Sequence, residues 1–421
     1  MKYCIVIGDG MADHPQPELG NKTPLQTAGT PMMDALAARG AVGTVRTVPE
    51  GIPAGSDTAI LSICGCDPRV YYTGRAPLEA AGAGVSLRPG DTAYRCNMVT
   101  LGDPGGTFPE PDYMQKRVLS HSGGAVEGDA ALHLMADLLA DPEFSACCAR
   151  HGMKITPSPS FRHIAVQHNA DIRYLVTMPP HDHLGEALGP LLPGPDGMEP
   201  ASGLRELMRL AHVFLDKHPL NAARRAEGHL PANGLWFWAQ GTAASLPSLK
   251  ETRGKSGFVV SAVPLVWGIG ALTGMDRIGV PGATAELDTD YEGKAAAVIQ
   301  GLSDGYDLAL LHVEAPDECT HMGDLPGKLE AIRRLDARCL TPLKAGLDKL
   351  GEDYRLLILS DHKTLTETRG HNGEPVPFLL YDSRELGPHS GAAYDEDACE
   401  AGPTIEEGHT LLGLLLEESP H

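Results

Sequence analysis

Residues 1–13, MKYCIVIGDGMAD, run from an apolar, β-branched segment into a glycine-rich turn that carries Asp9. The same pattern recurs in DLALLHVEAPDE at 307–318 and in RLLILSDH at 355–362. A short apolar run that stops at a turn is typical of a buried strand in an α/β sheet. The sequence therefore predicts three strands that each end in acidic residues, at the edge where open α/β sheets bind their ligands.

The two ends of the chain differ in composition from its middle. Residues 1–75 and 250–421 alternate strand-like runs with segments of helical period, which favours a mostly parallel sheet with helices on both faces. Residues 76–249 are richer in Pro, Gly and His, and we expect short strands there at HIAVQH (163–168) and IRYLVTM (172–178). We therefore predict the α/β class, with one domain built from both ends and a smaller α+β domain inserted between them.

Composition disfavours several classes of protein. The chain has 421 residues, of which 42% are hydrophobic and 21% charged, so it is long enough for two soluble domains. No apolar run reaches the roughly 18 residues that span a membrane, and the start shows no basic and apolar leader. Nine cysteines without CxxC spacing favour a reducing cytoplasm over a disulfide framework. The net charge of −21 disfavours nucleic acid as a partner, because it repels phosphate.

Side chains with metal-binding atoms gather in four short patches, three of which follow the predicted strands. Carboxylates, imidazoles and one hydroxyl at a single sheet edge are suited to hold two divalent ions beside a nucleophile. This combination predicts metal-assisted phosphoryl chemistry. The candidate metal ligands are Asp9, Ser56, Asp317, His321, Asp361, His362 and His371.

Each patch also has a plainer interpretation when it is taken alone. Asp9 between two glycines is typical of a turn, and His371 would equally suit a buried, hydrogen-bonded histidine. Asp317 and His321 stand at i and i+4, so they face the same way on a helix, but this spacing often arises by chance. The patches together favour a metal site more strongly than any single patch does, because they occur in the same half of the architecture.

Ser56 is the candidate nucleophile. It stands in PAGSDTAILSIC (53–64), directly before an apolar run of helical character. A plain N-cap serine would stabilise such a helix by about 1 kcal/mol and have no further role. A helix N-terminus also binds phosphate, and a serine hydroxyl becomes a nucleophile when a base or a metal activates it. The functional interpretation is that Ser56 attacks phosphorus and forms a phosphoserine.

Longer stretches of the sequence carry a family resemblance that covers essentially the whole chain. They include DGMAD at 9–13, PAGSDTAILSICGCDPRVYYTGRAPLEAAGAGV at 53–85, HVEAPDECTHMGD at 312–324 and SDHKT at 360–364. The chain resembles the cofactor-independent phosphoglycerate mutases of archaeal type, which belong to the alkaline phosphatase superfamily. The resemblance implies an alkaline-phosphatase-like metal-binding domain with an inserted phosphotransferase domain at 76–249.

The resemblance also implies how the metal ligands divide. One ion would be held by Asp9, Ser56, Asp361 and His362, and the other by Asp317, His321 and His371. Manganese is the expected ion, with zinc, cobalt or magnesium as alternatives that suit oxygen and imidazole ligands. Ser56 would take the phosphoryl group of 3-phosphoglycerate in a cleft between the domains and return it to the 2-oxygen of the retained glycerate.

A small phosphorylated substrate also needs cationic and hydrogen-bonding partners. We expect most of them in the inserted domain and one near the second crossing between the domains. Each of these side chains would equally suit a solvated surface position. The candidate substrate-binding residues are Asn97, His121, Arg162, His163, Asp182, Arg224 and Lys255, with Arg225 beside Arg224.

One stretch departs from the family pattern and keeps other activities open. Where the mutases carry an arginine-rich DRRAGR-like segment, this chain has YMQKRVLSHSGG at 113–124. A bacterial subgroup with a similar serine–histidine stretch is regarded as a proposed homoserine kinase, which makes a phosphotransferase with another small acceptor the first alternative. A metal-dependent phosphatase and a non-catalytic metal-binding protein are the others. No GxxxxGKS or GxxxxGKT phosphate loop occurs, which disfavours a P-loop kinase.

Overall fold

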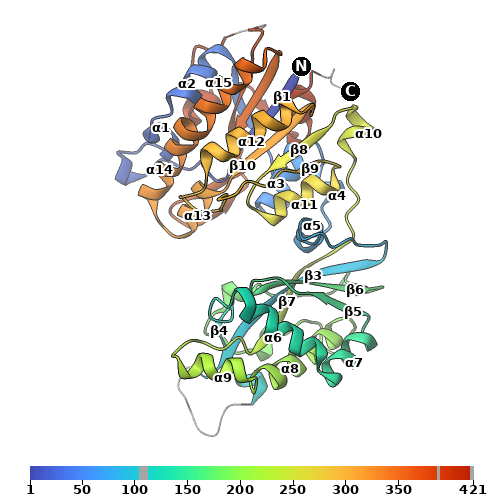
Figure 1. The fold of residues 1–421 in the computed structure, drawn as a ribbon. Coiled ribbons are helices and arrows are strands. Elements are labelled where there is room, and N and C mark those ends of the chain that lie inside the picture. Colours follow the sequence, from blue (N-terminus) through green and yellow to red (C-terminus); the bar gives the residue numbers. More distant parts are fainter. Residues whose placement is uncertain (104–111, 386–388, 418–421) are drawn as a thin grey trace. The chain divides into compact units, whose positions relative to one another are not determined.

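The computed structural model describes residues 1–103, 112–385 and 389–417, and the chain forms two compact units (Figure 1). Unit 1 comprises Met1–Tyr72 and Ser245–His421, and unit 2 comprises Thr73–Ala244. The predicted crossings between the two units lie after residues 75 and 249. Among the described residues, none of the helices is both long enough and apolar enough to span a membrane.

Unit 1 is built around an eight-stranded sheet with the order β15-β2-β14-β11-β1-β10-β8-β9 across the described residues. From β11 to β9 all neighbours run parallel, whereas β14 is antiparallel to both of its neighbours. The predicted α/β class with a mostly parallel sheet is confirmed. The strands are β1 (Lys2–Gly8), β2 (Ala41–Val45), β8 (Gly257–Val260), β9 (Asp276–Arg277), β10 (Leu308–Val313), β11 (Tyr354–Leu359), β14 (Val376–Asp382) and β15 (Thr404–Ile405).

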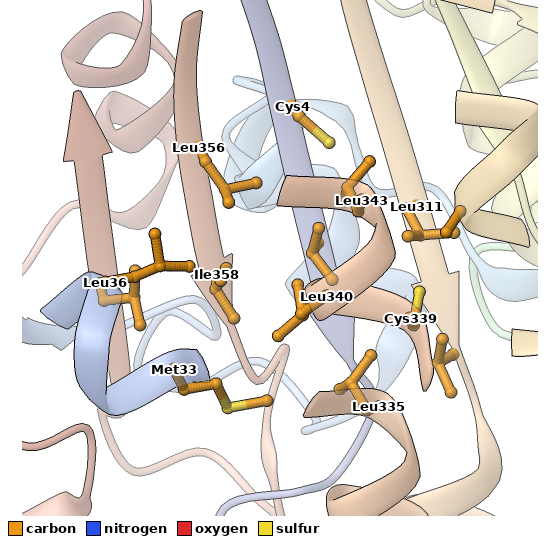
Figure 2. Close-up of a cluster of buried hydrophobic side chains, with 14 of the residues drawn as sticks. Cys4, Met33, Leu36, Leu311, Leu335, Cys339, Leu340, Leu343, Leu356 and Ile358 are labelled. Atoms are coloured by element: carbon orange, nitrogen blue, oxygen red, sulfur yellow. The ribbon is translucent and has the colours of Figure 1, made fainter. Parts of the chain in front are cut away.

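One face of this sheet carries the main core of unit 1. Figure 2 shows Cys4, Leu311, Leu356 and Ile358 of three neighbouring strands directed at Leu340 and other side chains of the covering helices. Fully burying such a side chain contributes about 1.5 to 3 kcal/mol, so this packing is a main source of stability. The covering helices are α1 (Pro24–Ala28), α2 (Pro31–Arg39), α12 (Tyr291–Ser303), α14 (Leu325–Arg334), the π-helical turn Leu335–Leu340 and α15 (Thr341–Leu350).

The other face of the sheet packs against the helix that begins at Ser56. All eight residues of α3 (Ser56–Ile63) are buried, so the helix and its first turn are held firmly in the fold. It lies against α11 (Pro264–Leu272) and α17 (Leu411–Leu415). Helices therefore cover both faces of the sheet, as the alternation of strand-like and helical segments predicts. Further short helices of unit 1 are α4 (Pro68–Tyr71), α10 (Leu249–Arg253), α13 (Ala315–His321) and α16 (Glu396–Glu400).

Unit 2 is an antiparallel sheet with most of its helices on one face and the short helix α5 (Arg75–Gly82) on the other. Its central strand β3 alternates between the core residues Tyr94, Cys96 and Met98 and the polar residues Arg95 and Asn97. Alternation along a strand places these two sets on opposite faces. The elements are β3 (Asp91–Gly102), β4 (Arg117–Ser120), β5 (Met153–Thr156), β6 (Arg162–His168), β7 (Gly234–Thr242), α5 (Arg75–Gly82), α6 (Gly128–Ala140), α7 (Pro142–Arg150), α8 (Ala201–Leu215) and α9 (Pro219–Ala226).

One predicted strand of unit 2 is wrong. HIAVQH lies in β6 as expected, but IRYLVTM at 172–178 forms a turn with a single bridge from Val176 to Gly194. Tyr174 is 69% and Val176 54% exposed, whereas Ile172, Leu175 and Met178 pack into the core of unit 2, so the stretch adds to the core without pairing as a strand.

Candidate active site

The carboxyl edge of the parallel sheet gathers the metal-type residues of unit 1. In the register of β1 with its neighbours, Gly8 lies opposite Val313 and Ile7 opposite Leu359, so the three strands end together. Asp9 directly follows β1, and Asp361 lies two residues beyond β11. The segment after β10 turns into α13, which carries Asp317 and His321. Segments far apart in the sequence thus position their acidic residues at the same edge of the sheet.

The first group of side chains surrounds the imidazole of His362. Its Nε2 lies 3.5 Å from Oδ1 of Asp9, 3.3 Å from Oδ2 of Asp361 and 3.2 Å from Oγ of Ser56. The two carboxylates and the imidazole are fully buried, and Ser56 is 8% exposed. Two acids, one imidazole and one hydroxyl therefore converge within hydrogen-bonding or metal-binding distance.

The second group is centred on the carboxylate of Asp317. His321 Nε2 lies 3.0 Å from Asp317 Oδ2, and His371 Nε2 lies 3.4 Å from Asp317 Oδ1. The i,i+4 spacing places Asp317 and His321 on the same side of α13, as predicted. The ring centroids of His362 and His371 are only 4.0 Å apart, so the two groups adjoin each other.

The donor atoms of these groups fit bound cations. Within the described part of the chain, Oδ1 of Asp9 and Oδ2 of Asp361 are buried without a hydrogen-bond partner. A buried carboxylate oxygen without a partner is costly, and a bound cation removes that cost. Oxygen and imidazole ligands suit manganese and zinc. The residues present thus fit the divalent ions that the sequence leads us to expect.

The balance of charge differs between the two groups. Burial, together with the charge of Asp361, raises the pKa of Asp9 well above its usual range. Burial also opposes ionisation of Asp317, but hydrogen bonds from His321 and His371 outweigh it and hold the pKa of Asp317 well below its usual range. The same hydrogen bond to Asp317 raises the pKa of His321 to about 9. The first group therefore needs added positive charge more than the second does.

Ser56 is placed for chemistry by the helix that it begins. It is the first residue of α3, where Gly55 occupies the N-cap position, and no side chain caps the helix there. The interpretation of Ser56 as a plain N-cap is therefore wrong. Its hydroxyl instead lies 3.4 Å from Oδ2 of Asp9 and 3.2 Å from Nε2 of His362. A Cβ added to Gly55 would lie 2.8 Å from Oδ1 of Asp57, so a larger residue before Ser56 would displace the Asp57 carboxylate.

Three further residues beside the first group are absent from the sequence-based set. His312 is fully buried, and its Nε2 lies 2.9 Å from Oδ2 of Asp9. Ser261 Oγ accepts the N–H of Val263 and lies 3.1 Å from Nδ1 of His312. The ionised carboxylate of Asp9 can only accept, so with Asp9 ionised His312 donates Nε2–H to it, orients it, and accepts the Ser261 hydroxyl at Nδ1. Glu314 lies next to this pair, with an oxygen 3.6 Å from His312 Nε2.

Buried groups beside the site hold the loop after Asp9 in place. Asp13 forms an ion pair of 2.8 Å with Lys328, and both side chains are fully buried. Glu396 of α16 accepts the backbone N–H of Asp13 at 3.2 Å and the hydroxyl of Thr23 at 2.6 Å. Burial raises the pKa of Glu396 to about 7, because the ionised form loses more hydration than these two donors restore.

Replacing Glu396 by glutamine should stabilise the protein in a pH-dependent way. The pKa of Glu396 is raised from 4.5 to about 7 on folding, so its folded form binds the proton more tightly. The stability that this tighter proton binding contributes is fully present below pH 4.5 and is lost as the pH rises to about 7. Gln keeps the shape of the protonated acid. We expect Glu396→Gln to match wild type at low pH and to exceed it by up to about 3 kcal/mol at pH 8.

Urea denaturation at several pH values measures this difference. Glu400→Gln, an exposed position on the same helix, is the matched control and should leave the curve unchanged. A stability difference between Glu396→Gln and wild type that does not depend on pH would contradict the assignment.

Unit 2 presents a cationic face on its sheet. Arg95 lies 4.2 Å above the ring of Trp238, whose Nε1–H donates to Oδ1 of Asn97 at 3.1 Å. Arg95 and Arg75 both pair with Glu79, at 2.9 and 2.8 Å. Burial opposes ionisation of Glu79, but the charges of these arginines outweigh it and lower its pKa. Arg95, Arg75 and Arg162 all act on Glu79, so positively charged side chains gather at this end of the face.

The predicted residues Asn97, His121 and Asp182 lie along this face. Asn97 donates from Nδ2 to the carbonyl oxygen of His121 at 3.0 Å. The ring of His181 lies 5.2 Å from that of Trp238 and 6.1 Å from that of His121. Asp182 is beside His181, with an oxygen 3.6 Å from its Nε2. Arg95 and His181 are absent from the predicted set, although alternation with Asn97 along one strand identifies Arg95.

Arg162 and Arg224 have different surroundings. Arg162 pairs with Asn97 across β6 and β3 and lies 4.9 Å from the ring of Phe161, so it shares the cationic face. Arg224 donates to the carbonyl oxygens of Gly123, Gly124 and Leu230. It therefore supports the backbone of the loop that contains His121, and Arg225 bonds to Asp216.

Two predicted substrate-binding residues are contradicted by their positions. His163 follows Arg162 on β6 and so points to the opposite, buried face, where it is 1% exposed and its Nδ1 accepts the N–H of Ser158. Lys255 precedes β8 and lies 5.3 Å from the ring of Tyr3, near the start of β1. Because β8, β10 and β1 are parallel, this is the amino edge of the sheet, opposite to Ser56.

Comparison with solved structures gives the class of the protein. A cofactor-independent phosphoglycerate mutase from Thermoplasma acidophilum aligns over 99% of both chains, with a TM-score of 0.62 and 25% identity. A Pyrococcus horikoshii protein aligns over 99% of this chain and 96% of its own, with a TM-score of 0.77 and 28% identity. Fold and site together define an α/β enzyme of the phosphoglycerate mutase class.

Sequence relatives identify the family. A probable 2,3-bisphosphoglycerate-independent phosphoglycerate mutase of Geobacter sulfurreducens is 43% identical over 99% of this chain and 100% of its own. The enzyme of the same name from Methanosarcina acetivorans is 42% identical over the same shares. A family profile with that description matches residues 37–221. The chain belongs to the 2,3-bisphosphoglycerate-independent phosphoglycerate mutases, as the resemblance predicts.

Proposed function

We propose that this protein interconverts 3-phosphoglycerate and 2-phosphoglycerate through a phosphoserine at Ser56, with two divalent ions and without bisphosphoglycerate. The observation that carries the proposal is the position of the Ser56 hydroxyl, which lies within 3.4 Å of both Asp9 and His362 at the start of a buried helix. Full-length relatives that carry the mutase name support the same reaction.

The proposed ligands divide into the two groups that the structure brings together. Asp9, Ser56, Asp361 and His362 would hold one ion, and the second would be held by Asp317, His321 and His371. Such ions lower the pKa of the serine hydroxyl and neutralise charge on the phosphoryl group. Manganese remains our first choice, with zinc, cobalt and magnesium as alternatives.

The residues of the chain account for the rest of the reaction. Ser56 Oγ loses its proton and bonds to phosphorus, while the C3 oxygen of the substrate leaves phosphorus and takes up a proton. The N-terminus of α3 favours the negative charge of the phosphoserine. In the second transfer the C2 hydroxyl loses its proton and bonds to phosphorus, while Oγ of Ser56 leaves phosphorus and takes up a proton, which regenerates the free serine.

The cationic face of unit 2 is the proposed recognition site for the glycerate. Arg95 and Arg162 suit a carboxylate, since guanidinium groups bind carboxylates in a bidentate way. His121 and His181 suit the hydroxyl groups. Burial lowers the pKa of both imidazoles, and their uncharged form can donate and accept hydrogen bonds. The stretch that departs from the arginine-rich family pattern thus contributes His121 to the proposed recognition site.

Turnover of 3-phosphoglycerate by metal-stripped and then manganese-reloaded protein tests the proposal. We expect isomerisation to 2-phosphoglycerate without added bisphosphoglycerate, loss of activity on chelation, and recovery on reloading. Metal-stripped protein reloaded with calcium is the control for non-specific stabilisation. Release of free phosphate, or a fully metallated enzyme without isomerase activity, would contradict the mutase and make homoserine the next acceptor to test.

A further inference from the structure

Thr364 contacts one residue from each metal-ligand group, although its side chain belongs to neither. It lies in the short strand β12 (Lys363–Leu365), opposite His371 in β13 (Gly370–Asn372). Its hydroxyl donates to Oδ1 of Asp317 at 2.6 Å and lies 3.2 Å from Nδ1 of His362. The residue is fully buried, so water does not compete for these bonds.

The protons on these atoms can be assigned by counting donors and acceptors. The Thr364 hydroxyl has one proton, and the ionised carboxylate of Asp317 can only accept, so that proton points to Asp317. The remaining contact is satisfied when Nδ1–H of His362 donates to Thr364 Oγ1. His362 is then bare at Nε2, the nitrogen that faces Asp9 and Asp361. A histidine must present such an unprotonated nitrogen to bind a metal.

The backbone of Thr364 is fixed on both sides. Its N–H donates to the carbonyl oxygen of Ala12 at 3.2 Å, and its own carbonyl oxygen accepts Nζ of Lys328 at 2.7 Å. Lys328 is held in turn by its buried ion pair with Asp13. The hydroxyl of Thr364 is therefore placed by a rigid support before any ligand binds.

Gly10 provides the space that this hydroxyl occupies. Its φ is +58°, a conformation that favours glycine. A Cβ at Gly10 would lie 2.3 Å from Oγ1 of Thr364 and 2.8 Å from Oδ1 of Asp317. The N–H of Gly10 donates to Oδ1 of Asp361 at 3.2 Å. The glycine of the DGMAD motif thus admits the Thr364–Asp317 contact and orients a ligand of the first group.

We propose that Thr364 is a positioning residue that fixes the tautomer of His362 and the orientation of Asp317, and so prepares both ion sites with one hydroxyl. This inference rests on the two-ion site of the proposed function. The loss of this one side-chain oxygen should therefore weaken the binding of both ions at once. A residue that served only packing would not act through its oxygen.

The test compares Thr364→Val, which keeps the shape of the side chain but loses the hydroxyl, with Thr364→Ser, which keeps the hydroxyl. Manganese affinity is measured by competition with a chelator, and the His362 tautomer by nitrogen NMR of metal-free protein labelled in its histidine rings. His362→Asn assigns the His362 signal. Loss of a supporting hydrogen bond of this kind weakens metal binding about 10- to 100-fold.

We expect Thr364→Val to bind both manganese ions about 10- to 100-fold more weakly than wild type and to shift the His362 ring to a mixture of tautomers. The manganese affinity of Thr364→Ser should stay within about threefold of wild type. Wild-type affinity and an unchanged tautomer in Thr364→Val would overturn the inference. If Thr364→Val does not fold, Thr364→Ala removes the same hydroxyl without adding apolar bulk. Failure of wild-type protein to bind two ions would instead overturn the proposed function, whereas the metal-free tautomer tests Thr364 separately.

Discussion

Replacing Ser56 by alanine should lower the rate of phosphoryl transfer by at least about ten-thousandfold, because no neighbouring group replaces the lost nucleophile. Its hydroxyl is the group directed at both Asp9 and His362 from the start of α3. Isomerisation kinetics measure the loss. A covalently phosphorylated peptide containing Ser56 should be trapped by acid quench from wild type and be absent from the variant.

The variant should keep its metal. Asp9, Asp361 and His362 remain in the first group, and the second group is unchanged, so metal analysis should find occupancy near that of wild type. Ser62→Ala is the matched control. Ser62 lies on the same helix, is 1% exposed, and its hydroxyl has no hydrogen-bond partner within the described residues. Full activity in Ser56→Ala, or an equal loss in Ser62→Ala, would overturn the assignment of the nucleophile.

Replacing Asp9 by asparagine should change activity and metal-free stability in opposite directions. The variant loses an anionic ligand, so we expect weaker binding of the first ion and a fall in activity of at least about a thousandfold. In the metal-free protein, burial and the charge of Asp361 raise the pKa of Asp9, which shows that its negative charge is unfavourable there. Asn removes that charge and should stabilise the metal-free protein by about 1 to 3 kcal/mol.

Hydrogen bonding also favours higher stability of the metal-free Asp9→Asn variant. In the wild-type protein Nε2 of His312 lies 2.9 Å from Oδ2 of Asp9. The side-chain oxygen of Asn at this position can still accept the Nε2–H of His312. Urea denaturation with chelator measures stability, and metal analysis measures occupancy. Asp353→Asn, an exposed acid next to the amino end of β11, is the control and should change neither quantity. Lower stability of metal-free Asp9→Asn would contradict the electrostatic account.

The sequence predicts the central fold well for a physical reason. Buried parallel strands must be apolar throughout, so β1, β10 and β11 appear as short apolar runs. Parallel neighbours also end at one edge, which is why Asp9, Asp317 and Asp361 could be expected together. Neither inference requires knowledge of the loops, whose course is set by tertiary contacts.

The direction of individual side chains is what the sequence shows least. His163 was expected beside Arg162, yet neighbours on a strand face opposite ways, and here the histidine lies in the core. Lys255 was expected near phosphate, but it precedes a parallel strand and so lies at the wrong edge. His312 and Thr364 were missed, because their roles depend on hydrogen bonds between segments that are distant in the chain.

The pairing of β1 between β10 and β11 also has a consequence for synthesis on the ribosome. Residues 73–244 emerge as a complete unit while β1 still lacks both of its neighbours. Gly10 and Asp361 are 351 positions apart, so their hydrogen bond forms only when most of the chain has been translated. Contacts of such long range are slow to form, and an unpaired apolar strand is prone to aggregate. The nascent chain therefore needs protection of its first strand until the last segments of the sheet arrive.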